Sequence, residues 1–267
     1  MKIFDIHTHI FPAKIAQKAS DNIGRFYDVP MAHDGSAEKL LQMMQENGIA
    51  KSLIFSAATT VEQVSHINDF IHTTVQENAD RFVGFFTLHP HMKEEKLADE
   101  FNRTVGMGLN GIKLHPDFQN FAIDDECTFP MYELAQQQGI PVVFHAGDPR
   151  HAYSNPHRIA NILRLFPHLV VVAAHFGGWG EWEAATQALA GFENVLADTS
   201  STRGFTDMDT VRKGLRFFGA DRLMFGTDYP MWDAKEELQF IDSLPITQEE
   251  KEKILYKNAC ALLNIEL

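Results

Sequence analysis

Two histidines near the N-terminus are the first residues whose spacing could carry chemistry. His7 and His9 stand one residue apart in MKIFDIHTHIF, within an apolar run that starts at residue 3. Residues i and i+2 of a strand point to the same face, so this alternation predicts Asp5, His7 and His9 on one face. Two imidazoles on one face can bind a metal ion. Two hydrogen-bonded histidines near a strand end are the alternative.

Further ionisable residues stand at the ends of the later apolar runs. They are His89 in LHP, Lys113 and His115 in GIKLHP, His145 in VVFHAGDP, His175 in VVAAHFGGWG, Asp198 in VLADTSS and Asp228 in LMFGTDYP. Histidine makes up only 13 of the 267 residues, so chance would rarely place so many at equivalent positions. Their convergence on one edge of a sheet favours a metal site over isolated structural histidines.

The apolar runs themselves predict the elements that position these residues. They cover residues 2–7, 51–57, 81–88, 110–115, 140–146, 168–175, 194–200 and 221–228. Segments with helical spacing lie between them, such as SAEKLLQMMQENG, which has Ser36 as a candidate N-cap and Gly48 at its end. Eight strands alternating with helices predict an α/β fold, a single (β/α)8 TIM-type barrel domain over 1–267. A doubly wound sheet would require a phosphate-type glycine loop or a switch point, and we find neither.

Two segments fall outside the repeating pattern. Residues 11–35 form a long connection rich in Pro, Gly, Asn and Asp. We expect a loop over the barrel mouth, with a plain surface excursion as the alternative. The tail, residues 247–267, has helical spacing, and we expect it to pack outside the barrel.

Composition limits the classes of partner. The chain carries 23 Lys and Arg against 36 Asp and Glu, a net charge of −13, and no basic run that could follow a phosphate backbone. Cys127 and Cys260 form no CxxC motif. No apolar run approaches the roughly 20 residues that span a bilayer, and the N-terminus does not look like a signal peptide. We expect a cytoplasmic protein that acts on a small-molecule substrate, without nucleic acid or membrane partners; a homo-oligomer is left open.

The ordered set of polar residues resembles the amidohydrolase superfamily. The set is HxH on the first strand, Lys on the fourth, His on the fifth and sixth, and Asp on the eighth. The closer resemblance is to the amidohydrolase-related branch, which includes aminocarboxymuconate-semialdehyde decarboxylase. It extends over the whole chain, through FDIHTHIF, GIKLHPDF, VVFHAGD, VVAAHFGG, LMFGTDYPM and NACALLNI. The resemblance implies a divalent metal, with zinc expected, one ion favoured and two conceivable.

The resemblance also assigns roles to the metal-site residues. His7, His9 and Asp228 are the expected ligands, because neutral imidazole and carboxylate suit Zn²⁺. His145 is the expected further ligand, with a hydrogen bond to substrate as its alternative. Asp228 is also expected to transfer a proton. His175 is expected to act as an acid/base or to polarise the substrate; some relatives use this histidine to bind a second metal.

Four residues are candidates for substrate binding. Lys113 could be a carboxylated bridge between two metals, a cation that binds a substrate carboxylate, or an unremarkable rim lysine. Alternation with its apolar neighbours predicts that Lys113 and His115 face inward together. Arg203, in TSSTRG, is a candidate anion clamp, and an exposed loop arginine is the alternative. Trp179 follows the sixth strand and is expected to line the pocket.

Hydrolysis is the reaction that these roles favour. A metal-activated water would attack a small amide, ester or lactone, with Asp228 taking the proton and His175 steadying the oxyanion. The alternative is a non-oxidative decarboxylase, a C–C lyase that acts on a small carboxylic acid. A metal-binding protein without turnover is a third interpretation, which the spare acid/base His175 disfavours.

Overall fold

The computed structural model describes residues 2–267 and has the (β/α)8 barrel predicted from the sequence. The strands are β1 (Phe4–His9), β2 (Lys51–Phe55), β3 (Phe82–Gly84), β4 (Ile112–Leu114), β5 (Val142–Phe144), β6 (Val171–Ala173), β7 (Val195–Asp198) and β8 (Leu223–Met224). Each lies within or overlaps a predicted run. Several strands end just before the polar residue of interest, so His115, His145 and His175 begin the loops that follow.

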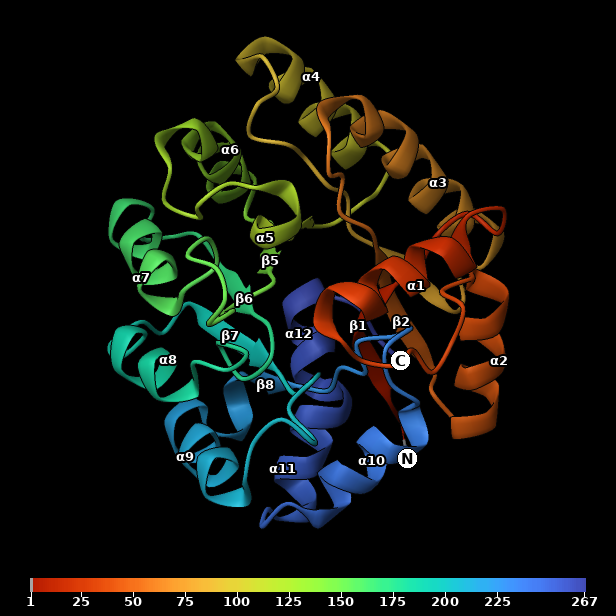
Figure 1. The fold of residues 1–267 in the computed structure, drawn as a ribbon, viewed down its shortest axis with the longest axis vertical. Coiled ribbons are helices and arrows are strands. Elements are labelled where there is room, and N and C mark those ends of the chain that lie inside the picture. Colours follow the sequence, from red (N-terminus) through yellow and green to blue (C-terminus); the bar gives the residue numbers. More distant parts are fainter. Residues whose placement is uncertain (1) are drawn as a thin grey trace.

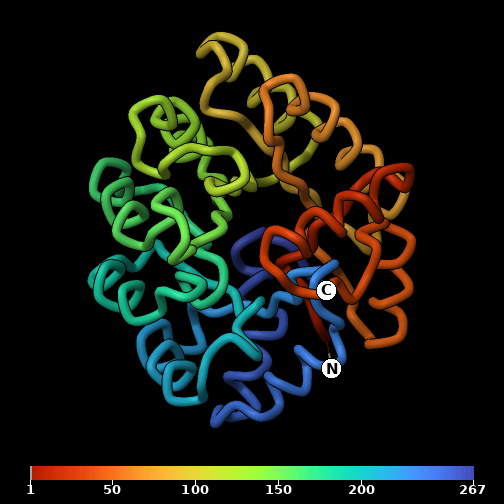
Figure 2. Tube along the Cα trace, viewed as in Figure 1, coloured from red at the N-terminus to blue at the C-terminus, as the bar shows by residue number. Residues whose placement is uncertain are grey.

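The strands close into a ring. The strands form two parallel sheets in chain order, one of β1, β2 and β3 and the other of β4, β5, β6, β7 and β8. The Phe86–Ile112 bridge joins the two sheets on one side, and the Thr8–Tyr229 bridge joins them on the other. The chain passes once around this ring, and its two ends lie near each other (Figure 2), where Lys2 Nζ donates to the carbonyl of Leu267. Closure pairs the edge strands of the two sheets with each other among the described residues and brings the carboxyl ends of the strands to one rim.

Helices surround the strands (Figure 1). They are α2 (Ala37–Asn47), α3 (Val64–Glu77), α4 (Glu94–Gly106), α6 (Phe129–Gln138), α7 (Pro156–Leu165), α8 (Trp182–Ala188), α9 (Met208–Phe218) and α10 (Ala234–Ser243), with the short α5 (Pro116–Gln119) after β4. The predicted limits of α2 are confirmed. The Ser36 hydroxyl accepts from Lys39 N, and Gly48 ends the helix with a φ of 66°. None of the helices among the described residues is both long and apolar enough to cross a bilayer.

The connection over residues 11–35 contains a helix where a loop was predicted. Helix α1 (Ala16–Tyr27) lies in front of β1 and β2 in Figure 1. The residues that it buries are all small: Ala16, Ser20 and Gly24. The sequence therefore shows no stripe of large apolar residues that would have revealed the helix.

A bulge in β1 overturns the predicted face of Asp5. Phe4 and Ile6 belong to the cluster that fills the barrel, and Asp5 between them turns away to accept from Thr227 N and Thr227 Oγ1. The register against β2 then shifts between Asp5 and Thr8. One extra residue changes the face of all that follow, so His7 and His9 point toward the barrel mouth without Asp5. Burial raises the pKa of the Asp5 carboxyl to about 7.

The C-terminal tail packs against the residues that fill the barrel, whereas the sequence predicted that it would pack outside the barrel. Helix α11 (Gln248–Glu252) leads through a π-helical turn (Lys253–Lys257) into α12 (Asn258–Leu263). Ala259 and Leu263 pack with Phe4, Val143 and other barrel-filling residues. Phe4 begins β1, so the tail closes the amino end of the barrel. Figure 1 shows α12 inside the ring of helices. Without it the apolar floor would face water.

We predict that Leu263→Ala lowers the free energy of unfolding by about 2 to 4 kcal/mol, because it opens a cavity beneath the barrel floor. Urea denaturation measures this change. Leu165→Ala is the matched control, since Leu165 also lies at the end of a helix but its side chain is 57% exposed. A loss no larger than that of the control would contradict the assigned closure.

Candidate metal centre and catalytic cavity

Three side chains bring metal-binding atoms together at the carboxyl end of the barrel. His7 Nε2 lies 3.3 Å from His9 Nε2 and 3.4 Å from Asp228 Oδ1, and His9 Nε2 lies 3.8 Å from the same oxygen. Two imidazole nitrogens and a carboxylate oxygen at these distances are a donor set suited to a divalent cation. The residues present therefore fit the metal expected from the sequence.

Asp198 fixes which nitrogen of His7 faces this cluster. Its Oδ2 accepts from His7 Nδ1 at 2.8 Å, and both side chains are buried. A carboxylate can only accept, so the His7 proton is on Nδ1 and the Nε2 lone pair points at His9 and Asp228. Burial alone would raise the pKa of Asp198; His7 beside it holds that pKa well below its usual range.

Asp228 is also held in place by its neighbours. Ser201 Oγ donates to Asp228 Oδ2, and Trp232 Nε1 donates to Ser201 Oγ at 2.9 Å. The other carboxylate oxygen of Asp228, Oδ1, therefore faces His7 and His9. The φ angles of Asp228, Ser201 and His175 are 60°, 45° and 61°, in the left-handed region. Such backbone costs roughly 1–3 kcal/mol per residue and persists only where the surroundings impose it. Here it aims three polar side chains into one space.

The hydrogen bonds of His175 and His145 determine their protonation pattern. His175 Nδ1 lies 3.2 Å from the carbonyl oxygen of Ser200, which can only accept, so Nδ1 carries the proton. His175 Nε2 then accepts from His145 Nδ1 at 3.0 Å, and His145 Nε2 is left with a lone pair. Burial lowers the pKa of His175 to about 4 and that of His145 well below its ordinary value, so both are neutral at pH 7.

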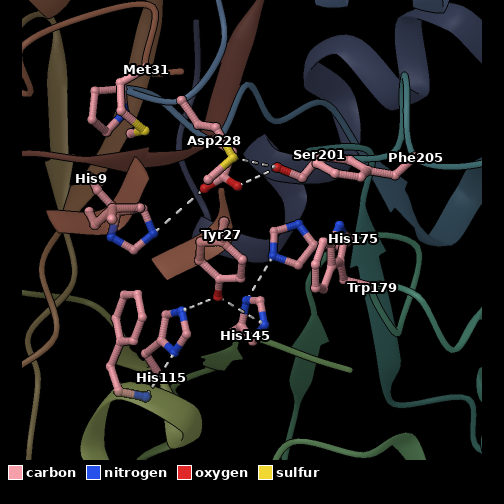
Figure 3. Close-up of a pocket in the computed structure, with 14 residues that line it drawn as sticks. His9, Tyr27, Met31, His115, His145, His175, Trp179, Ser201, Phe205 and Asp228 are labelled. Atoms are coloured by element: carbon pink, nitrogen blue, oxygen red, sulfur yellow. Dashed lines mark hydrogen bonds and ion pairs between the residues drawn. The ribbon is translucent and has the colours of Figure 1, made fainter. Parts of the chain in front are cut away.

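Tyr27 of helix α1 completes this chain of hydrogen bonds. Its hydroxyl lies 3.1 Å from His115 Nε2 and 3.4 Å from His145 Nε2 (Figure 3). Phe118 N donates to His115 Nδ1, so the proton of neutral His115 is on Nε2 and is donated to Tyr27. Tyr27 in turn donates to His145 Nε2. The predicted metal ligand His145 is thus engaged by Tyr27 and His175 and lies outside the three-residue donor cluster.

Lys113 faces inward, as alternation predicted, because Ile112 and Leu114 pack on the outer side of β4. Its side chain is fully buried, with Nζ 3.2 Å from His7 Nε2 and 4.8 Å from the ring centre of Phe55. Burial lowers the pKa of Lys113 to about 8. A fully buried side chain excludes the alternative that Lys113 is an exposed lysine on the rim of the barrel. Both remaining alternatives, a carboxylated lysine that bridges two metals and an unmodified cation, fit this buried position.

A cavity opens above the donor cluster. Its lining residues come from the strand ends, from α1 and its following loop, and from the loops after β4, β6, β7 and β8. They are His9, Ile23, Tyr27, Met31, His115, Phe118, His145, His175, Trp179, Ser201, Phe205, Asp228, Pro230 and Met231. The predicted residues His115 and Trp179 line it, whereas Lys113 lies behind His7. The cavity has imidazoles and a carboxylate on its floor and aromatic side walls.

Arg203 does not reach this cavity, contrary to the anion clamp expected. Its Nε donates to Glu237 Oε1 at 2.9 Å, a second nitrogen donates to Glu236, and its guanidinium lies over the Trp232 ring. The two carboxylates of α10 draw it away from the mouth. His89 is likewise turned aside, where its Nδ1 accepts from His91 N.

Sequence reasoning missed several residues of the site. Asp198 was recognised only as a polar strand end, and its bond to His7 was not. Ser200 and Ser201, in ADTSST, carried a usable signal, since hydroxyl residues after a catalytic strand often orient its neighbours. Tyr27 carried none, because its segment lies 88 residues from His115 in the chain.

The fold and the donor cluster together define a class, a TIM barrel with a metal-type centre at the carboxyl end of its strands. Comparison with known proteins identifies the family: residues 4–265 match the Amidohydrolase family profile, and the chain belongs to that family. Curated relatives include 2-amino-3-carboxymuconate-6-semialdehyde decarboxylase of Dictyostelium discoideum, 23% identical over 77% of this chain and 67% of that protein. Gamma-resorcylate decarboxylase of Polaromonas sp. (strain JS666) is 21% identical over 85% of this chain and 87% of that protein.

Solved structures confirm the fold. An uncharacterised TIM-barrel protein from Bordetella bronchiseptica superposes with a TM-score of 0.84, at 22% identity and 99% coverage of both chains. A dihydroxybenzoic acid decarboxylase from Polaromonas sp. JS666, solved with manganese and the inhibitor 2-nitroresorcinol, has a TM-score of 0.77 at 18% identity. The superposition covers 98% of this chain and 97% of the Polaromonas chain.

We predict that Asp198→Asn weakens divalent-metal binding by about 10- to 100-fold, because the amide no longer fixes the His7 proton on Nδ1. Chelator competition followed by elemental analysis measures the affinity. Asp209→Asn is the control, since Asp209 is an exposed aspartate on α9. Equal affinities of Asp198→Asn and the unchanged chain would contradict the role given to Asp198.

The same elemental analysis gives the number of ions per chain. A His7→Ala/His9→Ala chain supplies the metal-free baseline. We expect one ion per chain with or without bicarbonate, because a cationic Lys113 repels a second metal. Two ions with bicarbonate, falling to one in Lys113→Met, would instead identify a carboxylated lysine.

Proposed function

We propose that this protein is a metal-dependent non-oxidative decarboxylase of a small planar carboxylic acid. The observation that carries the proposal is the cavity, where a donor cluster for a cation lies beneath aromatic walls formed by Phe118, Trp179 and Phe205. Such walls suit a flat ring or conjugated chain, and the floor suits its carboxylate. The two curated relatives are decarboxylases, which supports this reaction over the hydrolysis that the sequence favoured.

His7, His9 and Asp228 would hold the metal. Zinc suits two imidazoles and a carboxylate, and the similar Polaromonas structure binds manganese, so these are the two ions to test first. When bound, the cation would anchor the substrate carboxylate and stabilise negative charge that develops during the reaction.

The protein's own residues would deliver the proton. Loss of CO₂ breaks the C–C bond, and the electron pair that remains on the substrate carbon must take up one proton. His175 is neutral in the resting site, with its proton on Nδ1 at the Ser200 carbonyl, so its Nε2 must take up a proton before it can deliver one. His145, whose Nδ1 lies 3.0 Å away, would pass its proton to this nitrogen and take one from water at its own Nε2. The His175 imidazolium would then give the Nε2 proton to the substrate carbon, so that water is the net source of the proton and CO₂ is the group that leaves.

The proposal is tested with purified protein loaded with manganese or zinc. The panel of acids includes 2,6-dihydroxybenzoate, 5-carboxyvanillate and an aminocarboxymuconate semialdehyde, each with a ¹³C-labelled carboxyl group, and released ¹³CO₂ is measured. A parallel panel of amides, esters and lactones tests hydrolysis. We expect CO₂ release that chelation abolishes. Metal-dependent hydrolysis without CO₂ release from any acid would overturn the proposal.

We predict that His175→Asn lowers kcat by 10² to 10⁴, the usual loss for a general acid or base, with metal content retained. Asparagine keeps a polar group but cannot carry the transferred proton. His157→Asn is the control, because His157 lies on α7, away from the cavity lining. Complete loss of metal in His175→Asn would make this residue a ligand and contradict the assignment.

A further inference from the structure

The cavity above the donor cluster is too small for the substrate class proposed for it. Its open volume is about 30 Å³. A cavity that holds one benzene ring has about 150 Å³, whereas one water needs roughly 10–15 Å³. A planar acid therefore does not fit directly above the donor cluster unless part of the lining moves. His7 and His9 lie on β1, and His145, His175 and Asp228 follow other barrel strands. Hydrogen bonds within the barrel hold these residues, so the movable part must lie elsewhere.

The Tyr27 side chain fills the space that a substrate ring would need. Figure 3 shows its ring between the donor cluster and the His115–His145 pair. Its ring centre lies 5.3 Å from that of Trp179 and 6.0 Å from that of His145. The phenol thus offers the cavity what a small hydroxylated ring would offer: a flat apolar body and one oxygen within reach of His115 and His145.

Helix α1, which carries Tyr27, is weakly anchored along most of its length. Its fully buried residues are only Ala16, Ser20 and Gly24, whereas Ile23, Phe26 and Tyr27 are partly buried. Its N-cap residue Ile15 makes no side-chain capping bond and is 51% exposed. By contrast α2 buries Leu40, Met43 and Met44. A cavity of about 950 Å³ separates α1 from the segment 56–70, which gives the helix room to move. Few buried apolar contacts mark a region that opens at low cost.

Arg150 is the main exception to this weak anchoring. It binds Asp148 with two nitrogens, at 2.9 and 2.7 Å, while a third nitrogen donates to the carbonyl oxygen of Phe26 at 2.7 Å. Its guanidinium also lies 4.7 and 5.0 Å from the ring centres of Phe26 and Tyr27, and 5.4 Å from that of Trp179. The buried Asp148 carboxylate fixes Arg150, and Arg150 fixes the C-terminal end of α1.

We propose that Tyr27 is a displaceable plug that occupies the substrate-ring position, that α1 is the lid that carries it, and that Arg150 is the latch. The assignment of a ring to this position rests on the proposed function; the lid and latch do not. Substrate entry must break the two Tyr27 hydrogen bonds. Tyr27 is then a specificity-determining residue, because only ligands that bind the floor strongly enough to displace it are admitted.

The latch is tested by hydrogen–deuterium exchange of the ligand-free chain. Arg150→Met should speed exchange of the α1 amides at least tenfold and leave those of α2 unchanged. Arg158→Met is the matched control, because Arg158 also joins a carboxylate, Asp124, to a loop carbonyl but does not contact α1. Tyr27→Phe, which leaves the Arg150–Asp148 pair intact, should give a smaller acceleration. Unchanged α1 exchange in both Arg150→Met and Tyr27→Phe would overturn the lid.

The plug is tested with benzoate as the probe, titrated into the manganese-loaded chain. Tyr27→Ala should bind benzoate about tenfold more tightly than the unchanged chain, since one to two hydrogen bonds no longer need to be broken. Benzoate should also speed α1 exchange in the unchanged chain. Equal or weaker binding by Tyr27→Ala, no binding by either chain, or protection of α1 by benzoate would each overturn the plug. None of these readouts requires turnover, so a failed decarboxylase assay leaves them interpretable.

Discussion

The buried carboxylate of Asp198 is the constraint around which the carboxyl end of the barrel is arranged. A carboxylate removed from water is costly unless donors surround it. Asp198 obtains them from three neighbouring segments: His7 Nδ1 on β1, His175 N after β6, and Ser200 N and Oγ after its own strand. Each hydrogen bond that stabilises the Asp198 carboxylate also positions a residue of the site. The same carboxylate therefore fixes the His7 tautomer and the backbone of His175.

Backbone irregularities then aim the side chains that this constraint brings close. The bulge in β1 turns Asp5 toward Thr227 and leaves His7 and His9 at the mouth. Left-handed φ angles at His175 and Asp228 end the alternation of their strands, so their side chains enter the cavity. A regular strand could not deliver two successive inward residues. Such positions persist only where the surrounding structure imposes them, and here the bonds of His175 N to Asp198 and of Ser201 to Asp228 hold these residues in place.

The site thus combines a rigid floor with a loosely held roof. The floor consists of strand ends tied by buried hydrogen bonds, and a donor cluster of this kind needs such rigidity to hold a cation in fixed geometry. The roof is α1, which covers the cavity mainly through Tyr27 and the Arg150 latch. Burial keeps His145 and His175 neutral, and a carbanion-like step would benefit from the same low exposure to water. The decarboxylation proposed above would need both parts.

The sequence by itself determined the features that depend on local pattern and residue type. Apolar runs and the helical spacing between them predicted the eight strands and α2, and the ordered His and Asp residues predicted a metal-binding rim. Only the tertiary structure decided which partner each polar group would find. Asp5 went to Thr227, Arg203 to two glutamates of α10, His145 to His175 and Tyr27, and the tail to the barrel floor. The reason is physical: an element's period is set by its neighbours in the chain, whereas a buried charge or an apolar face is satisfied by whichever group the closed barrel brings within a few ångströms.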